Sequence, residues 1–200
     1  MPIMPNTLSD EQRLEESFNE LARRLREPDV LNPQHGAAVF YLVFPPSQIL
    51  TVRRLLPAWM ARLQHEQDLQ VQQVSLAEIL WELVDESRRW EGWLAVEGDF
   101  EQEQVNDAIA SVLRENNAFV QRVVERALKA EPGQVVFLTD VELLHPYFRT
   151  RPIEGALHQQ AQAPVVFLYP GRRAGQYGLH FLGFYPEDPG YRSSLIGGLA

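Results

Sequence analysis

The pattern of apolar and polar residues predicts an amphipathic helix near the N-terminus. Serine and glutamine at positions 9 and 12 match a capping box, in which the two side chains satisfy free amides of the first helical turn. Pro28 ends the run, because proline cannot continue a helix. The apolar residues of this stretch, residues 8–27, fall at helical spacing and are Leu14, Phe18, Leu21 and Leu25.

The same periodicity predicts further helices downstream. Ser47 and Ser75 each precede an apolar run of helical period, and serine is a preferred N-cap, so each is expected to open a helix. Pro57 is expected to kink the first of these helices. Residues 105–128 carry a long helical face that Pro132-Gly133 ends, and a short helix is expected after about residue 152.

Between these helices, residues 90–104 show no helical or strand period. Such a stretch is typical of a loop. We therefore expect a variable loop here, in which Trp90 and Trp93 cover edges of the core.

Short apolar runs rich in β-branched and aromatic residues predict the strands of a sheet. Runs of this kind alternate with helices, an order that favours parallel strands. Residues 177–184 alternate apolar with small or polar residues after a glycine-containing turn, so they are expected to pair antiparallel with the preceding strand. The four predicted parallel strands are residues 37–44, 69–74, 134–139 and 164–169.

These elements predict one α/β domain that spans residues 1–200. We expect three layers around a mostly parallel central sheet of four to five strands, with an N-terminal helix and an antiparallel C-terminal edge strand. The arrangement would resemble that of P-loop proteins without a Walker A motif. Residues 1–36 would form the N-terminal helix and its connection, residues 37–192 the core, and residues 193–200 a tail.

Composition narrows the classes of function. The formal net charge is −9, which argues against direct DNA binding because phosphate neutralisation requires Lys and Arg. The chain contains no cysteine, which excludes disulfides, thiol nucleophiles and thiolate metal sites. The longest apolar run, residues 37–44, is too short to span a membrane. We therefore expect a cytoplasmic protein.

The common catalytic and cofactor motifs are missing from the sequence. No glycine-rich loop ends in Lys followed by Ser or Thr, and the only lysine is Lys129. Neither the dinucleotide fingerprint nor the nucleophile elbow is present. No two histidines have the spacing that places two metal ligands on one helical face. The sequence therefore predicts a protein that is not an enzyme and binds no metal or cofactor.

Two residues after the third predicted strand have alternative interpretations. Asp140 lies where an acid would assist metal or phosphoryl chemistry, but a turn residue is the simpler interpretation. His145 is either a loop histidine held by backbone groups or a general base. Together they define one hypothesis, a hydrolase centred on Asp140 and His145.

The most positive stretch of this acidic chain lies near its C-terminal end. Residues 143–186 hold four arginines and a single acidic residue before Pro186, Glu154. Arg149 and Arg151 are suited to an anion-binding fork, since guanidinium groups bind carboxylate and phosphate bidentately. Pairing within the protein, or solvation, is the alternative for both.

Residues 135–151, VVFLTDVELLHPYFRTR, resemble the BrxB family of BREX phage-defence systems. The resemblance continues through APVVFLYPG at residues 163–171 and LHFLG at residues 179–183, and it ends at Tyr191-Arg192. Two places depart from the family pattern: Asp140, where a small residue or glycine is usual, and Phe44-Pro45-Pro46, where an acidic, polar turn is usual.

The resemblance implies a subunit of a complex that blocks phage replication and supports methylation of host DNA. Family members have no enzymatic activity assigned to them. The implied partner is the alkaline-phosphatase-like subunit, PglZ, with the methyltransferase and the large ATPase of the same system nearby. The first hypothesis is therefore a non-catalytic adaptor that binds PglZ.

Arginine and aromatic side chains dominate the energetics of protein interfaces, so the partner-binding surface is placed on such residues. A second hypothesis is a nucleotide- or nucleic-acid-binding domain that uses the arginines at positions 149, 151, 172 and 173. The residues predicted to bind the partner are Tyr147, Phe148, Arg149, Arg151, Tyr169, Arg172, Arg173 and Arg192.

Overall fold

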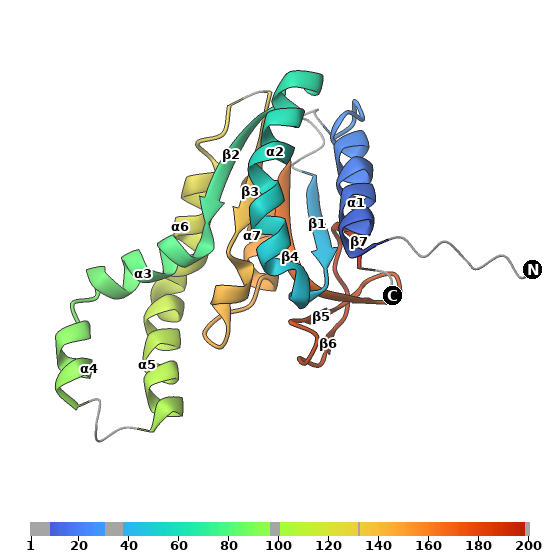
Figure 1. The fold of residues 1–200 in the computed structure, drawn as a ribbon. Helices are drawn as coiled ribbons and strands as arrows, with labels where there is room; N and C mark the ends of the chain where they lie inside the picture. Colours follow the sequence, from blue (N-terminus) through green and yellow to red (C-terminus); the bar gives the residue numbers. More distant parts are fainter. Residues whose placement is uncertain (1–8, 31–37, 97–100, 132, 199–200) are drawn as a thin grey trace, which may run out of the picture.

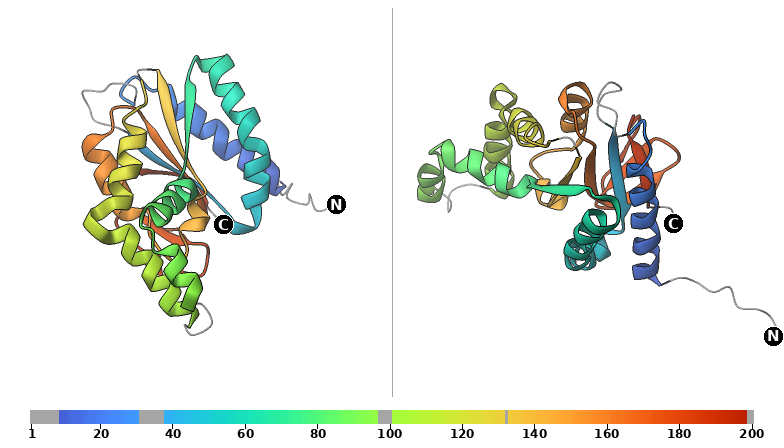
Figure 2. Two further views of the ribbon diagram at one scale, coloured as in Figure 1. Left: turned by 90° about the vertical axis from the view of Figure 1, so that its left-hand side faces the viewer. Right: turned by 90° about the horizontal axis from the view of Figure 1, so that it is seen from above.

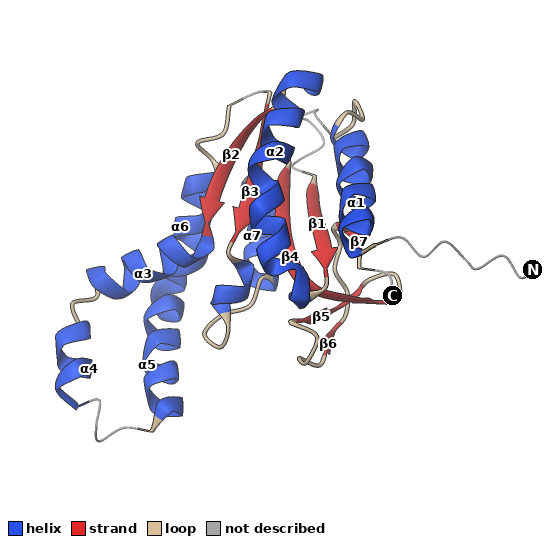
Figure 3. Cartoon of the chain, viewed as in Figure 1, coloured by secondary structure: helices blue, strands red, loops and turns tan. Residues whose placement is uncertain are grey.

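The computed structural model confirms the predicted fold class, a mostly parallel central sheet between two layers of helices (Figures 1 and 3). It describes residues 9–30, 38–96, 101–131 and 133–198. Most of the predicted connection before the first strand, and the predicted helix stop at Pro132, lie outside these residues. No helix in the described ranges is long and apolar enough to cross a membrane.

Five parallel strands form the main sheet in the order β2-β3-β4-β1-β7. β1 lies between β4 and β7, and Tyr41 faces Phe167 on β4 and Leu195 on β7 in the register of the sheet. All six residues of β1 are buried, as expected for a strand covered on both faces. The bounds are β1 Val39–Phe44, β2 Gln70–Ser75, β3 Gln134–Thr139, β4 Val165–Ala174 and β7 Ser194–Gly197.

The second half of β4 leaves the main sheet and forms a hairpin. Its residues from Gly171 to Ala174 pair antiparallel with β5, Gly178–Phe181, and β5 pairs with the two-residue strand β6, Glu187–Asp188. The predicted antiparallel pairing with the fourth strand is thus confirmed. The edge of the main sheet beside β1 is instead β7, which lies within the predicted tail. The sequence of β7 has only a weak strand pattern, because only Ile196 of its four residues is buried.

Helices cover both faces of the sheet (Figure 2). α1, Asp10–Leu25, and α2, Ile49–Gln67, pack on the face that carries Phe40 and Leu42. α3, Leu76–Glu86, α6, Ala118–Ala127, and α7, Arg151–Gln160, pack on the opposite face with Tyr41. Alternate residues of each strand thereby enter separate apolar clusters, as the pleat of a strand requires.

Two of the three serine caps are as expected. Ser9 forms the complete capping box of α1, and the Ser75 hydroxyl accepts a hydrogen bond from the amide of Glu78 at the start of α3. Ser47 does not cap α2. Pro45-Pro46 leads into a 3-10 turn, Pro46–Gln48, so Ser47 lies inside that turn and α2 begins after it.

The predicted loop at residues 90–104 is largely helical. α4, Trp90–Val96, and the first residues of α5, Gln102–Arg114, lie within it. The long helix expected after it is broken into α5 and α6, because Asn116 and Asn117 adopt positive φ angles of 51° and 59°. The helices between β2 and β3 form an arm whose α4 and α5 project away from the sheet (Figure 1).

Candidate functional site

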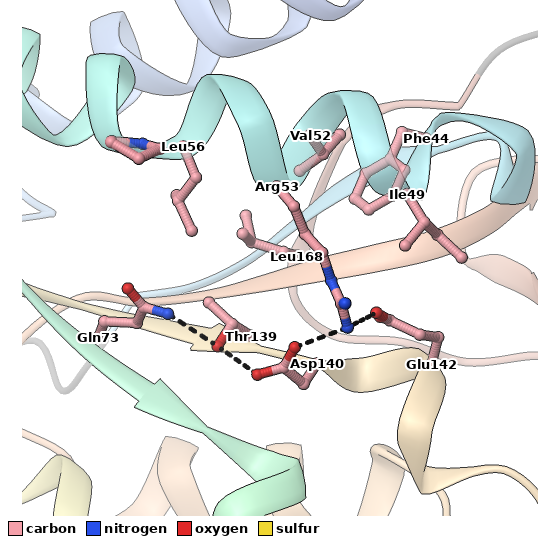
Figure 4. A pocket seen from close by; sticks show the side chains of 11 residues that line it. Phe44, Ile49, Val52, Arg53, Leu56, Gln73, Thr139, Asp140, Glu142 and Leu168 are labelled. Carbon is pink, nitrogen blue, oxygen red and sulfur yellow. Dashed lines mark hydrogen bonds and ion pairs between the residues drawn. The ribbon is translucent and has the colours of Figure 1, made fainter.

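A pocket of about 320 Å³ lies beneath α2 at the carboxyl ends of the central strands. Ligands in open α/β sheets bind outside the carboxyl ends of the strands, so this pocket is a candidate ligand-binding or catalytic site. Arg53 on α2 reaches down to two carboxylates, those of Asp140 and Glu142 (Figure 4). The apolar wall of the pocket consists of Phe44, Ile49, Val52, Leu56, Pro57 and Leu168.

The carboxylate of Asp140 is held by three side chains. Oδ2 accepts hydrogen bonds from Ser75 Oγ at 2.7 Å and Thr139 Oγ1 at 3.1 Å, while Oδ1 lies 2.9 Å from Arg53 Nη2. The residue has a positive φ of 59°, a conformation that aspartate tolerates better than most residues. Asp140 is therefore a turn residue that joins β2, β3 and α2.

The partners of Asp140 are not apparent from the sequence. Arg53 Nη2 also lies 2.7 Å from Glu142 Oε1, so one guanidinium serves two carboxylates. The sequence does not predict this cluster of Arg53, Asp140 and Glu142, because Arg53 and Asp140 are 87 residues apart. In the described parts of the chain no group of three or more His, Cys, Asp and Glu side chains is arranged to hold a metal ion.

His145 lies in a different neighbourhood, beside the hairpin. Its Nδ1 is hydrogen-bonded to the hydroxyl of Tyr185, and its ring packs edge-on against Phe184 at 5.4 Å between centroids. Partial burial, followed by the positive charge of Arg149, lowers the pKa of His145 below its ordinary value. The imidazole is thus neutral at pH 7 and has a tyrosine as its partner, not Asp140.

Arg149 and Arg151 do not form a fork. The Arg149 guanidinium stacks on the ring of Tyr185, 3.6 Å from the centroid, and donates to the carbonyl of Phe148. Arg151 instead forms an ion pair with Asp188 on the hairpin. Pairing within the protein is therefore the interpretation that holds for Arg151.

A second pocket, of about 300 Å³, lies between Arg149 and the hairpin. The Tyr191 hydroxyl donates to Asp188 Oδ2 at 3.2 Å. Burial raises the pKa of Tyr191 to about 12, and burial raises the pKa of Tyr169 further still. Both phenols therefore stay protonated at neutral pH and can act as hydrogen-bond donors. The other residues that line this pocket are Arg149, Thr150, Phe181, Tyr185, Pro186 and Glu187.

Two residues predicted to bind a partner are not on the surface, and their assignment is corrected. Phe148 is 8% exposed and packs edge-on against Phe119 of α6 at 4.9 Å between ring centroids. Tyr169 is 1% exposed and stands edge-on to Tyr41 within the sheet. Both rings are part of the core because large aromatic surfaces are buried wherever two layers meet.

The remaining arginines of the C-terminal region do not converge on one site. Arg172 is exposed and lines a groove of about 430 Å³ beside α1. Arg173 points toward β7, where it donates to the carbonyl of Leu195 at 3.3 Å. Arg192 is exposed between β6 and β7. The four arginines of the nucleic-acid hypothesis thus lie in at least three separate environments.

Tyr147 is half-buried, and its ring packs edge-on against that of Trp81 on α3, 6.5 Å between centroids. Trp81 was not predicted as a surface residue. Phe184, which is 64% exposed, and Tyr185 were also not singled out. A helical wheel would have found Trp81, because it lies opposite the buried Leu76, Leu80 and Leu83 side of α3.

Fold and surfaces together define a three-layer α/β protein in which Arg149, on the loop before α7, stacks on Tyr185, on the loop after β5. A family model described as "BREX protein BrxB" matches residues 72–196. That match covers more than half of the chain, so the chain belongs to the BrxB family of BREX proteins.

One curated relative extends the likeness to nearly the whole chain. The BREX protein BrxB of Bacillus cereus (strain H3081.97) is 26% identical over 195 residues. The match covers 91% of this chain and 96% of the relative. No solved structure gives a significant match.

Proposed function

We propose that this chain is a non-catalytic subunit of a BREX anti-phage assembly that binds the PglZ-type alkaline-phosphatase-like subunit. Through that contact it supports host methylation and phage restriction. Membership of the BrxB family supports the BREX role. The contact itself is proposed from the surface chemistry of the hairpin and of the loop before α7.

One observation carries the proposal: Arg149 is stacked on Tyr185 and has no acidic partner within the described residues. The ring of Phe184 lies 4.6 Å from that of Tyr185 and faces solvent. A stacked guanidinium loses little side-chain entropy when it binds a carboxylate. We call Arg149, Phe184 and Tyr185 the arginine–aromatic surface. Its guanidinium group and rings suit a partner with acidic and apolar groups.

The absence of a catalytic role is also proposed. Asp140 and His145, the two candidates for chemistry, each have partners within the protein and lie in different neighbourhoods. General acid–base catalysis needs a group within hydrogen-bond reach of the reacting atom. The carboxylate of Asp140 is paired with Arg53 and accepts hydrogen bonds from two hydroxyl groups, so it is better suited to a structural role than to proton transfer.

The test is co-expression of this chain with the PglZ-type subunit of its own system, followed by size-exclusion chromatography and a titration of the purified pair. We expect a stable complex that forms at micromolar concentration. Arg149→Ala and Phe184→Ala should each weaken it by about tenfold or more, because Arg and aromatic residues dominate interface energies. Their matched controls are Arg54→Ala on α2 and Tyr177→Ala in the hairpin turn, both exposed.

Two outcomes contradict different parts of the proposal. Failure of the wild-type pair to associate at micromolar concentration contradicts the adaptor function. Association that survives both substitutions contradicts only the assignment of the arginine–aromatic surface. The nucleic-acid hypothesis is tested in parallel by calorimetry with short duplex DNA at low salt, where phosphate binding is strongest. We expect no heat from that titration.

A further inference from the structure

A row of aromatic rings runs across three elements on another part of the molecule. The ring of Trp81 on α3 is edge-on to Tyr147 on one side and to Trp90 of α4 on the other, the latter at 6.2 Å between centroids. Trp90 is in turn edge-on to Trp93 at 6.3 Å. We call Tyr147, Trp81, Trp90 and Trp93 the tryptophan row.

The row is both accessible and supported from within. Trp81 is 42% exposed and Trp90 41% exposed. Exposed leucines lie on the same elements, Leu94 on α4 and Leu143 in the turn before Tyr147. Each ring is in edge-to-face contact with the next, a favourable geometry that restricts its rotation. Rigid aromatic side chains bind a partner with little loss of entropy.

Acidic side chains accompany the row. Glu78 and Asp85 are three residues before and four residues after Trp81 on α3, so they flank it on the exposed face. Glu91 follows Trp90. Within the described residues none of these three carboxylates has an ion-pair partner, and Arg88 is the unpaired base nearby. The rim of the row is therefore negative.

Several other acids and bases of the arm form ion pairs with one another. Glu82 and Glu86 pair with Arg122 and Arg126 of α6, and Arg89 pairs with Glu115. Those charges are already compensated, whereas the three carboxylates beside the tryptophans are not. The electrostatic preference of the row is thus set by Glu78, Asp85 and Glu91.

From this juxtaposition we propose that the tryptophan row is a docking site for a basic, amphipathic segment of a protein partner. Apolar side chains of the segment pack between the rings. Its Lys or Arg side chains reach the ring faces, where cation–π attraction operates, and the three carboxylates. Nucleic acids and anionic membranes also bind exposed tryptophans, but the acidic rim repels both.

This inference goes beyond the proposed function, because it names a second surface and a partner of opposite charge. The arginine–aromatic surface suits acidic groups, and the tryptophan row suits basic ones. The three tryptophans of the row lie on α3 and α4, which belong to the arm that projects from the sheet (Figure 2).

The experiment uses the full chain and a synthetic Lys/Leu peptide that forms a few turns of amphipathic helix, with a Glu/Leu peptide of identical pattern as its control. Calorimetry should show binding of the Lys/Leu peptide only. Trp81→Ala combined with Trp90→Ala should weaken that binding by about tenfold or more. Leu50→Ala, at an exposed apolar residue on α2, should leave it unchanged.

A second pair of substitutions keeps the rings intact, in case the double tryptophan variant fails to fold. Glu78→Gln with Asp85→Gln should weaken the Lys/Leu complex several-fold and reduce its dependence on salt, since two screened attractions are lost. Circular dichroism checks that each variant is folded.

Four results would overturn the docking site. They are no binding of the Lys/Leu peptide, equal binding of both peptides, binding that is indifferent to the tryptophan and carboxylate variants, and tighter binding to oligothymidine or to phosphatidylserine vesicles. The last two probes report the nucleic-acid and membrane alternatives. None of these results depends on whether the PglZ-type subunit binds, so the two proposals fail separately.

Discussion

At the residue scale, Asp140 shows how a side chain that resembles a catalytic acid can be structural. Its position just beyond β3 is where an α/β enzyme would place an acid. Its left-handed backbone and its hydrogen bonds to Ser75 and Thr139 make it the joint between two strands instead. Ser75 has two tasks there, because its hydroxyl donates to Asp140 and accepts from the first turn of α3.

Substitutions at Asp140 separate these roles. Asp140→Asn keeps tolerance of the left-handed conformation but loses the charge that pairs with Arg53, so we expect a loss of about 1 to 2 kcal/mol in the free energy of unfolding. Asp140→Ala also strains the backbone, which adds about 1 kcal/mol. Urea denaturation measures both losses.

Asp140→Asn also tests the absence of chemistry, together with His145→Gln, whose side chain can still hydrogen-bond to Tyr185. At matched cellular abundance, both variants should retain protection against phage. A folded, abundant variant that no longer protects would show that the lost side chain takes part in a reaction or in partner binding, and co-purification with the PglZ-type subunit would tell these apart.

At the element scale, the break between α5 and α6 shapes the arm. One helical periodicity runs through both segments, which is why the sequence predicts a single helix. Asn116 and Asn117 interrupt it, because asparagine enters the left-handed region at lower cost than most residues. The chain thereby turns, and Phe119 can pack against Phe148. The periodicity indicates the buried face but not the direction of the axis.

Replacing Asn117 tests this break. Asn117→Val should cost about 1 to 2 kcal/mol of unfolding free energy, since a β-branched side chain opposes positive φ. Asn117→Gly should be near neutral, because glycine adopts this conformation freely. Gln121→Val, at an exposed position within α6, is the matched control and should cost only a few tenths of a kcal/mol. Thermal and urea unfolding of the four proteins compares them, and equal losses in Asn117→Val and Gln121→Val would refute the strain argument.

At the scale of the whole molecule, a buried glutamate holds the C-terminal strand in place. Glu154 on α7 accepts hydrogen bonds from the backbone amide and the hydroxyl of Ser193, and His158 lies 3.1 Å from the same hydroxyl. Ser193 directly precedes β7, which covers the open edge of β1. The link therefore ties α7 to the start of β7, beside the first residues of β1, and keeps the apolar strand β1 from becoming an edge.

Loss of this link should be costly. Glu154→Ala leaves the buried amide of Ser193 without its acceptor and the hydroxyl with only the ring of His158, so we expect a loss of about 2 to 3 kcal/mol in the free energy of unfolding. Glu154→Gln retains an acceptor oxygen and should lose less than half as much. Hydrogen exchange at the Ile196 amide should speed up more than exchange at Val136 in the centre of the sheet. Uniform acceleration at both sites would mean that Glu154 supports the whole core and not β7 in particular.

Local patterns in the sequence were enough to predict the four main parallel strands and the fold class, because buried strands and capped helices leave such patterns. The family was predicted from the resemblance of residues 135–151 and 163–192. Features without a local pattern depended on tertiary contacts. Arg53 pairs with Asp140, which is distant in the sequence. Phe148 and Tyr169 are buried because helices pack over them or against the sheet, and Ser194–Gly197 is a strand because it pairs with β1. Which arginines and tryptophans remain open to a partner follows from those contacts, since exposure belongs to the packed molecule and not to the residue.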